Sequence, residues 1–295
     1  MRFVRAMLAL VILLAAGSVM AGAEEQQAAP DSVRVRMITL RDGSTLIGKI
    51  VASDDTTITF ESSVGRSTIK RDRIREIKEI DESRIKKGGY WFPNPNRNRL
   101  YMWPTGRSLR KGQGYFGDIY IFFPSVAYGF TDNFSIEAGL TLFPGVDMDK
   151  QLMYAVPKIS YELSPGADLS IAAMLFRIPD EFDFDTGHAF MVGLLCGTAT
   201  LGSEDHSLSL GLGYGYADGE WADKPAVVVG GETRVTRRLV LISENWMSPG
   251  IEDVMISYGV RFIGERMAVD LALFNVLDED AIFPGIPFLG FIWNF

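Results

Sequence analysis

The sequence has 295 residues, of which 47% are hydrophobic and 12% aromatic, with a single cysteine and a formal net charge of −8. This length accommodates one large domain, or a small domain beside a large one. The acidic balance argues against general nucleic-acid affinity, and the lone Cys196 excludes a disulfide within the chain. Beyond the leader described next, no apolar run reaches the roughly 18 residues that a membrane-spanning helix requires.

Residues 1–23 have the composition of a secretory signal peptide. Arg2 and Arg5 precede the apolar run 6–16, and Ala21-Gly22-Ala23 stands before two glutamates. This order of positive charge, apolar core and small residues predicts cleavage after Ala23. Loss of the two arginines changes the net charge from −8 to −10. An uncleaved anchor helix is the alternative, but it would need a longer apolar run.

A small β-rich module is predicted over residues 32–80. Four or five short strands are expected from the runs VRVRMITL, STLIGKIVA, TTITFES and STIKRDRI, which turn signals such as Asp42-Gly43 separate. The segment LRDGSTLIGKIVASDDTTITF resembles the start of an Sm-like or SH3-like small barrel. That resemblance implies RNA binding in some relatives, but the cations here alternate with acids and Phe60 is the only ring available for stacking bases. A solvated charged face is the preferred interpretation, with a protein or cell-wall partner as the open alternative.

Residues 81–98 change composition to glycine, proline and the aromatic cluster Tyr90, Trp91 and Phe92. We interpret this segment as a linker whose aromatic side chains suit the headgroup level of a membrane. The alternative is that it folds into the mouth of the next domain as a partial plug.

From residue 99 to 295 the sequence repeats an alternating run of about 8 to 15 residues followed by a turn. About twelve strands are predicted, starting near residues 99, 114, 134, 151, 168, 188, 206, 225, 239, 253, 267 and 287. Short connections at 131–133, 164–167, 202–205, 236–238 and 264–266 alternate with longer ones. Pro124 falls inside the strand that starts near 114, so a bulge that switches faces is expected there.

The alternation separates apolar from polar side chains on most of these strands. Leu208, Leu210 and Leu212 share one face, opposite Ser209 and Gly211. In a membrane barrel the apolar face meets lipid, whereas a soluble β-sandwich would bury it in a dry core. Glycine at every second position in GLGYG (211–215) suits a crowded inner wall rather than a nucleotide loop. Glu244 and Trp246 fit the scheme less well, because they share a face with Val240 and Ile242.

The last strand, FLGFIWNF, places Leu289, Phe291, Trp293 and Phe295 on one face and ends on an aromatic residue. This pattern resembles the terminal strand of bacterial outer-membrane β-barrels, which the barrel-assembly machinery reads. The resemblance implies an all-β fold: an antiparallel transmembrane barrel of about twelve strands, preceded by the small module. It also implies the outer membrane as location and its lipid as a partner, and it makes Phe291, Trp293 and Phe295 the expected assembly signal. Short turns on the periplasmic side place the module in the periplasm.

Strand parity predicts which charged side chains face the lumen. The expected lumen-lining residues are Asp118, Glu137, Lys158, Glu162, Glu232, Arg234, Glu244, Arg261 and Asp270. If they line water, the lumen is a weakly cation-preferring path. If they pair tightly, they fill a barrel of this size and leave no conduit.

No catalytic residue, cofactor or metal site is predicted. His206 lies beside Ser207, but neighbouring residues of a strand point to opposite faces, and His188 has no recognisable catalytic context. The acidic runs in the longer connections, such as DEFDFD at 180–185, match no metal-loop spacing.

The sequence is consistent with two functions. The first is a narrow, porin-like channel or passive transporter for small solutes. The second is a structural anchor that presents the module to a periplasmic protein or cell-wall partner. The two differ in whether a continuous opening runs through the barrel.

Overall fold

The computed structural model describes residues 34–86, 89–179, 189–217, 219–248, 254–277 and 284–295. The expected signal peptide and the acidic run 180–185 lie outside these residues. The described residues form two compact units, which divide between Gly89 and Tyr90. They contain no helix long and apolar enough to cross a membrane.

The first unit is a five-stranded antiparallel sheet. Its strands are β1 (Arg36–Leu40), β2 (Thr45–Ser53), β3 (Thr57–Ser62), β4 (Gly65–Lys70) and β5 (Ile74–Glu79), in the order β4-β3-β2-β1-β5. Ile38, Ile58, Phe60 and Ile69 are buried together, because alternate residues of neighbouring strands meet on one face of the sheet. Two short strands at the unit boundary are β6 (Ile85–Lys86) and β7 (Gly89–Tyr90). The resemblance to Sm-like barrels stays a prediction.

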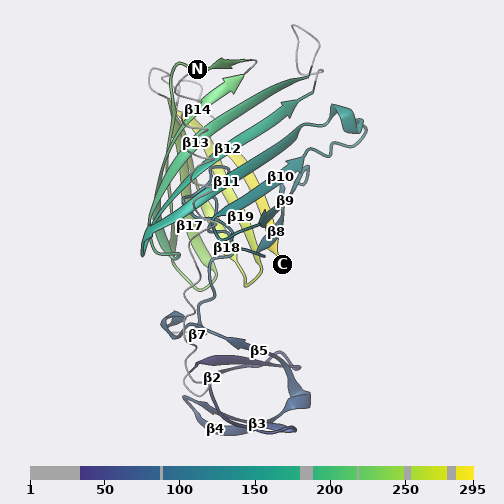
Figure 1. The fold of residues 1–295 in the computed structure, drawn as a ribbon, viewed down its shortest axis with the longest axis vertical. Coiled ribbons are helices and arrows are strands. Elements are labelled where there is room, and N and C mark those ends of the chain that lie inside the picture. The colour runs from purple at the N-terminus through teal and green to yellow at the C-terminus, as the bar shows by residue number, and fades with distance from the viewer. Residues whose placement is uncertain (1–33, 87–88, 180–188, 218, 249–253, 278–283) are drawn as a thin grey trace. The chain divides into compact units, whose positions relative to one another are not determined.

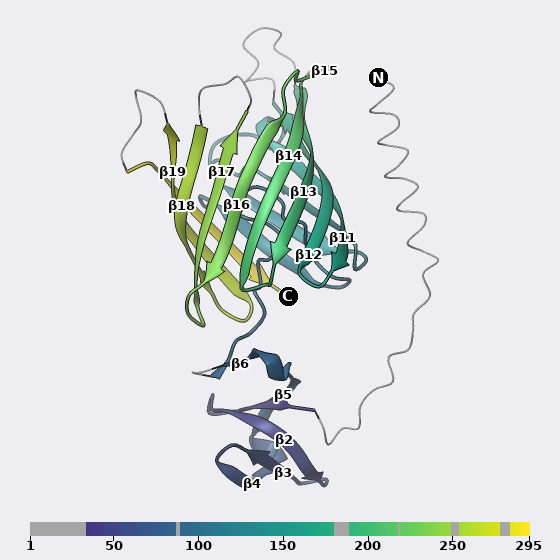
Figure 2. The ribbon, with the colours of Figure 1, turned by 90° about the vertical axis from the view of Figure 1, so that its left-hand side faces the viewer.

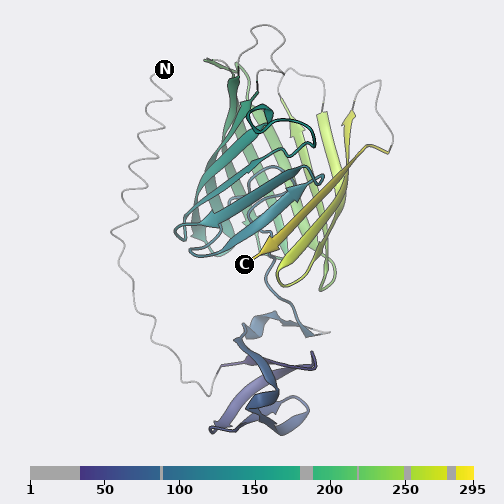
Figure 3. The same cartoon turned by 90° about the vertical axis from the view of Figure 1, so that its right-hand side faces the viewer.

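The second unit is a closed antiparallel barrel of twelve strands, seen from three sides in Figures 1, 2 and 3. The wall strands are β8 (Gly114–Ile119), β9 (Phe123–Gly129), β10 (Phe134–Leu140), β11 (Met153–Ser164), β12 (Ala167–Ile178), β13 (Phe190–Gly202), β14 (His206–Ala217), β16 (Ala226–Arg234), β17 (Leu239–Met247), β18 (Val254–Ile263), β19 (Met267–Leu277) and β20 (Ile286–Asn294). The two-residue strand β15 (Glu220–Trp221) extends the end of β14. Pairing of β20 with β8, from Gly290 opposite Ile119 to Asn294 opposite Tyr115, closes the cylinder. The fold class predicted from the sequence is therefore confirmed.

The twelve strands are not quite those predicted. No strand starts at 99, and the long strand expected from 114 is instead the hairpin β8–β9, so the two differences cancel in the count. The hairpin turns at Tyr120 and Ile121, whose φ angles of 54° and 70° lie in the left-handed region that non-glycine residues rarely adopt. The bulge expected at Pro124 is wrong, because the chain reverses direction before it and Pro124 pairs with Asp118.

The connections define two ends of the barrel. The predicted short connections are all present and lie at one end, called here the short-turn end, with the start of β8 and the end of β20. The opposite end, called here the loop end, carries the longer connections 141–152, 179–189, 218–225, 248–253 and 278–285. The tight β8–β9 turn is the exception at the loop end. β8, β9 and β10 lie side by side and are the three shortest described strands of the wall (Figure 3).

Candidate functional site

The strand register sorts the wall residues into an outer and an inner face. Leu208, Leu210 and Leu212 on β14 are each about half exposed (48%, 48% and 50%), whereas Ser209 and Gly211 between them are buried. The same division holds on β10, β18 and β20, as the sequence predicts. An apolar outer face on a closed barrel is the arrangement that a lipid bilayer requires.

A segment of the chain fills the inside of the barrel from the short-turn end. This segment, residues 90–110, is called the plug. It includes residues that the sequence assigned to a linker and to a first strand. Tyr90 and Phe92 are buried, so their expected place at a membrane surface is wrong, and the alternative, a partial plug, describes this segment. At its tip the plug turns back as a tight hairpin, in which the Leu100 N–H donates to the Trp103 carbonyl (2.9 Å) and the Thr105 N–H to the Asn98 carbonyl (3.0 Å).

The tip of the plug is the centre of the barrel's hydrophobic core. Leu100, Tyr101 and Trp103 have no exposed surface. The Trp103 ring meets the ring of Trp246 edge-on, with centroids 4.9 Å apart. A Cβ atom on Gly211 would lie 2.3 Å from Trp103 Nε1, so the inner wall needs glycine there to admit the indole. The crowded inner wall predicted from GLGYG is confirmed at this position.

Glu244 holds the tip of the plug by its backbone. Its Oε2 atom accepts hydrogen bonds from the N–H groups of Tyr101 (2.8 Å), Met102 (3.0 Å) and Trp103 (3.1 Å). Its Oε1 atom accepts from Trp246 Nε1 (2.7 Å). A fully buried carboxylate needs such compensation, because each unpaired charge in a dry interior is costly. The shared face of Glu244, Trp246 and Ile242, which the sequence left unexplained, is therefore the face that contacts the plug.

Arg261 forms a second attachment next to the first. Its guanidinium bonds to both carboxylate oxygens of Asp270 (2.6 and 3.0 Å) and lies 3.2 Å from Oε2 of Glu232. It also donates to the plug carbonyls of Asn96 (2.9 Å) and Leu100 (2.7 Å). The three charged residues are buried, and the one guanidinium offsets part of the charge of the two carboxylates while it fixes the plug.

Two further cations predicted from parity reach the plug. Lys158 donates to the carbonyls of Asn98 (2.7 Å) and Arg107 (2.5 Å). Arg234 donates to the Phe92 carbonyl (2.7 Å), and its guanidinium lies 4.9 Å from the centroid of the Phe92 ring. The structure thus brings Lys158, Glu232, Arg234, Glu244, Arg261 and Asp270 onto the inner wall around the plug.

The remaining three predicted lumen residues lie elsewhere. Glu137 faces inward, where it accepts from the Tyr115 hydroxyl (2.6 Å) and pairs with Arg99 (3.5 Å). Glu162 is on the inner face of β11 but is exposed at the end of the strand. Asp118 differs from the prediction: it pairs with Phe291 in the sheet and shares the outer face of β8 with the exposed Phe116, whereas Ile119 faces the lumen.

Several residues that join the plug to the wall were missed in the sequence. Arg107 Nε donates to Asp168 (2.8 Å), and its other nitrogens donate to the carbonyls of Gly202 and Ser203. Trp103 Nε1 donates to Thr198 Oγ1 (2.8 Å). Without knowledge that 90–110 folds inward, no spacing in the sequence connects these residues.

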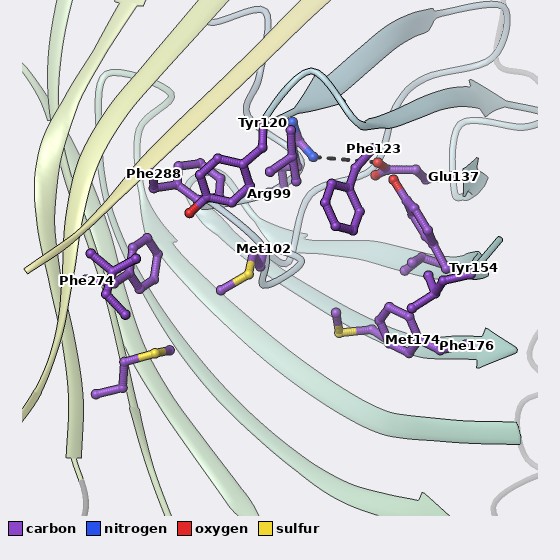
Figure 4. A pocket seen from close by; sticks show the side chains of 15 residues that line it. Arg99, Met102, Tyr120, Phe123, Glu137, Tyr154, Met174, Phe176, Phe274 and Phe288 are labelled. Atoms are coloured by element: carbon purple, nitrogen blue, oxygen red, sulfur yellow. Dashed lines mark ion pairs between the residues drawn. The ribbon is translucent and has the colours of Figure 1, made fainter. Parts of the chain in front are cut away.

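The other end of the lumen holds an apolar cavity of about 410 Å³ (Figure 4). Its walls come from strands β8–β12 and β18–β20, and its floor includes Arg99 and Met102 of the plug. The rings of Phe123, Phe176 and Phe288 line it. Below it, a void of about 30 Å³ next to Lys158 shares Arg99, Met102 and Glu137 with its lining.

Groups that suggest chemistry are sparse in the described part of the chain. No cluster of three or more metal-ligating side chains is present there. His206 is exposed at the start of β14, and His188 lies outside the described residues. Cys196 is buried, with its thiol 3.5 Å from the Ala172 carbonyl.

The closed barrel, its apolar outer face and the charged groups inside it define an outer-membrane β-barrel protein whose lumen is partly filled by its own chain. No protein-family model matches the sequence, and no curated protein is found to be similar.

Solved structures give a likeness of fold. A KdgM porin in complex with disordered oligogalacturonate has 8% identity and a TM-score of 0.44, covering 62% of this chain and 98% of that one. OmpT, an outer membrane protein of Vibrio cholerae, has 12% identity and a TM-score of 0.33, covering 89% and 95%. OmpF of Salmonella typhi in complex with daunomycin has 10% identity and a TM-score of 0.33, covering 88% and 95%. At these TM-scores the likeness carries no information on ligand or activity, which must come from the geometry of this chain.

Proposed function

We propose that the protein is a closed outer-membrane barrel that anchors its N-terminal unit and conducts no solute in its resting state. One observation carries this proposal: the buried charges at the centre of the lumen bond to the plug and to one another. Glu244 and Arg261 are fully buried, and each binds plug backbone. A water-filled channel would leave such groups solvated.

The ends of the barrel support a periplasmic position for the N-terminal unit. Outer-membrane barrels have short periplasmic turns and longer outer loops. The plug leads into β8 at the short-turn end, and β20 finishes there. The N-terminal unit then faces a periplasmic protein or the cell wall. Phe291, Trp293 and Phe295, of which the last two are exposed, remain the proposed signal for the assembly machinery.

Planar-bilayer conductance of the refolded full chain tests the proposal. We expect no current above the lipid background from wild-type protein whose barrel is shown to be intact by its heat-modifiable migration. Reproducible single-channel steps from intact wild-type barrels would overturn it. Glu162→Gln, which changes an inner-face glutamate exposed at a strand end, is the matched control for the Glu137→Gln variant described next.

A narrow channel for small solutes is the second candidate, and one feature favours it. The loop-end cavity and the small void beside Lys158 share lining residues and so mark a discontinuous path between the plug and strands β9–β11. If ions use this path, Glu137→Gln would shift the reversal potential of any wild-type current. A current with an unchanged reversal potential would place the path elsewhere.

A further inference from the structure

The lumen is divided into two parts of opposite character. Around the plug, inward positions carry charged and polar side chains such as Lys158 and Arg261. Toward the loop end, inward positions of the same strands carry apolar side chains: Val156 of β11 follows the parity of Lys158, and Met255 of β18 that of Arg261. A conducting barrel keeps its interior polar throughout. The apolar half therefore has a different role.

We infer that the loop-end cavity is a binding site for an alkyl chain, whose polar end lies at the mouth. Its volume of about 410 Å³ is within the range of small-molecule sites, roughly 300–1,000 Å³. A cavity with hydrocarbon walls offers water few hydrogen bonds, so an apolar occupant is preferred. The inference goes beyond the proposed function and does not depend on whether the barrel conducts.

The polar groups of the cavity are largely committed to partners within the protein. At the floor, Arg99 and Glu137 form an ion pair, drawn as a dashed line in Figure 4, and the Tyr115 hydroxyl binds the other oxygen of Glu137. Near the mouth, the Tyr120 hydroxyl donates to the Pro287 carbonyl (2.8 Å). The floor therefore carries compensated charge. A ligand is selected by its chain and not by a charged headgroup.

The apolar lining suits a flexible chain. Met102, Met174 and Met255 come from the plug, β12 and β18, and face the cavity together. Methionine side chains are unbranched and polarizable, so they adapt to occupants of irregular or variable shape. The rings of Phe274 and Phe288 pack against each other, with centroids 5.4 Å apart, and give one wall a fixed surface.

The position of the cavity relates it to the membrane as a source of chains. It is bordered by Ile119, Tyr120 and Phe123, which belong to the β8–β9 hairpin. The strands of this hairpin are among the shortest of the barrel wall. The outer face of the same short strands has an apolar groove of about 390 Å³, lined in part by Phe116 and Leu140. Alkyl chains of the bilayer thus lie next to the hairpin. The chain can be that of a free single-chain amphiphile or that of a phospholipid.

Position-resolved labelling is the suitable test, because the bilayer dissolves an alkyl chain as well as the cavity does. Full-length protein is refolded into phosphatidylcholine nanodiscs and exposed to dodecanol carrying a diazirine near its chain end. Light-induced adducts are then located by peptide mass spectrometry. A second arm uses phosphatidylcholine with the same diazirine in one acyl chain, and so distinguishes the two sources of the chain.

We expect saturable adducts at Met102, Met174 and Phe274, which unlabelled dodecanol reduces at least fivefold. Adducts on outward residues such as Leu289 should increase without saturation. Met174→Trp fills the cavity and should lower the inward adducts about tenfold. Leu175→Trp is its matched control, since Leu175 is the next residue on β12 and is exposed on the outer face.

A second pair protects the test against a folding defect. Met255→Trp fills the cavity from β18, and Ile256→Trp adds the same ring to the outer face. Inward adducts no stronger than those of outward residues in both arms would overturn the inference. So would inward labelling that neither folded cavity-filling variant reduces. Labelling by the alcohol, by the phospholipid or by both supports the site and identifies the source.

Discussion

The attachment of the plug by Glu244 predicts a large local effect from a one-atom change. In Glu244→Gln the carboxylate becomes an amide with one acceptor oxygen and one NH2 donor group. The oxygen can face either the three plug N–H groups or the Trp246 indole, but not both. The NH2 group must then point at a donor in a fully buried place. No orientation of the amide satisfies both sides.

The magnitude follows from the lost acceptor and the donors left unpaired. A hydrogen bond to a charged group contributes about 1.5–3 kcal/mol, and a buried donor without a partner costs about 1–3 kcal/mol. We therefore expect the plug tip to lose about 4 kcal/mol of local stability. At about 1.4 kcal/mol per factor of ten, this corresponds to roughly a thousandfold faster exchange of the tip amides.

Hydrogen–deuterium exchange of the refolded protein measures this effect directly. Peptides that contain Tyr101–Trp103 should lose protection in Glu244→Gln, while wall peptides such as β14 stay protected. Glu162→Gln makes the same chemical change at an exposed inner-face position and should leave the tip unchanged. Unaltered exchange of the tip amides in a folded Glu244→Gln barrel would refute the role given to Glu244.

Three further predictions test other parts of the structure. Gly211→Val places a side chain where Trp103 Nε1 lies, and should expel the indole, with a red-shifted tryptophan emission; an unshifted spectrum would contradict the packing. Leu210→Arg puts a charge on the outer face, and should destabilise the barrel by about 2–4 kcal/mol in urea unfolding from lipid vesicles if Leu210 is near the bilayer midplane, whereas a neutral result would contradict the lipid contact. In the N-terminal unit, hydrogen bonds from the Thr57 side chain and neighbouring N–H groups lower the pKa of Asp54. The stability that the Asp54 carboxylate contributes to the folded unit is therefore complete above the unfolded pKa of about 3.9, and it is lost as pH falls through the lower folded pKa. The Thr57 amide shift should report that lowered midpoint in an NMR titration, and a midpoint at or above 3.9 would contradict it.

The sequence predicted the barrel because a bilayer imposes a regular pattern on its wall. Leu208, Leu210 and Leu212 must all contact lipid, so local alternation carries the fold class. The β8–β9 hairpin was missed because Tyr120 and Ile121 take left-handed φ angles without glycine or asparagine, the usual signal of such a turn. The face of Asp118 was also misassigned: it shares the outer face with Phe116, whereas Ile119 lines the cavity.

The plug was the harder feature to predict, for a physical reason. An apolar residue looks the same in sequence whether it contacts lipid, a cavity or another segment of the chain. Leu100, Tyr101 and Trp103 therefore resembled part of a wall strand. Glu244 and Trp246 resembled a break in the alternation of apolar and polar residues along their strand. Strand parity identified most of the charged residues that hold the plug. Their partners are largely backbone carbonyls and N–H groups, which nearly every residue has, so the sequence does not show which ones are bonded.

The path of the plug has a consequence for assembly and release. Its two limbs leave the barrel through the same opening: Arg97 pairs with Glu204 on the way in, and Arg107 binds the carbonyls of Gly202 and Ser203 on the way out. Because both ends of the plug are at the short-turn end, the plug can leave a closed barrel without a chain end passing through it and without two paired strands separating. The barrel wall and the plug can therefore form or separate in different steps, and the inward limb of the plug connects the barrel to the N-terminal unit.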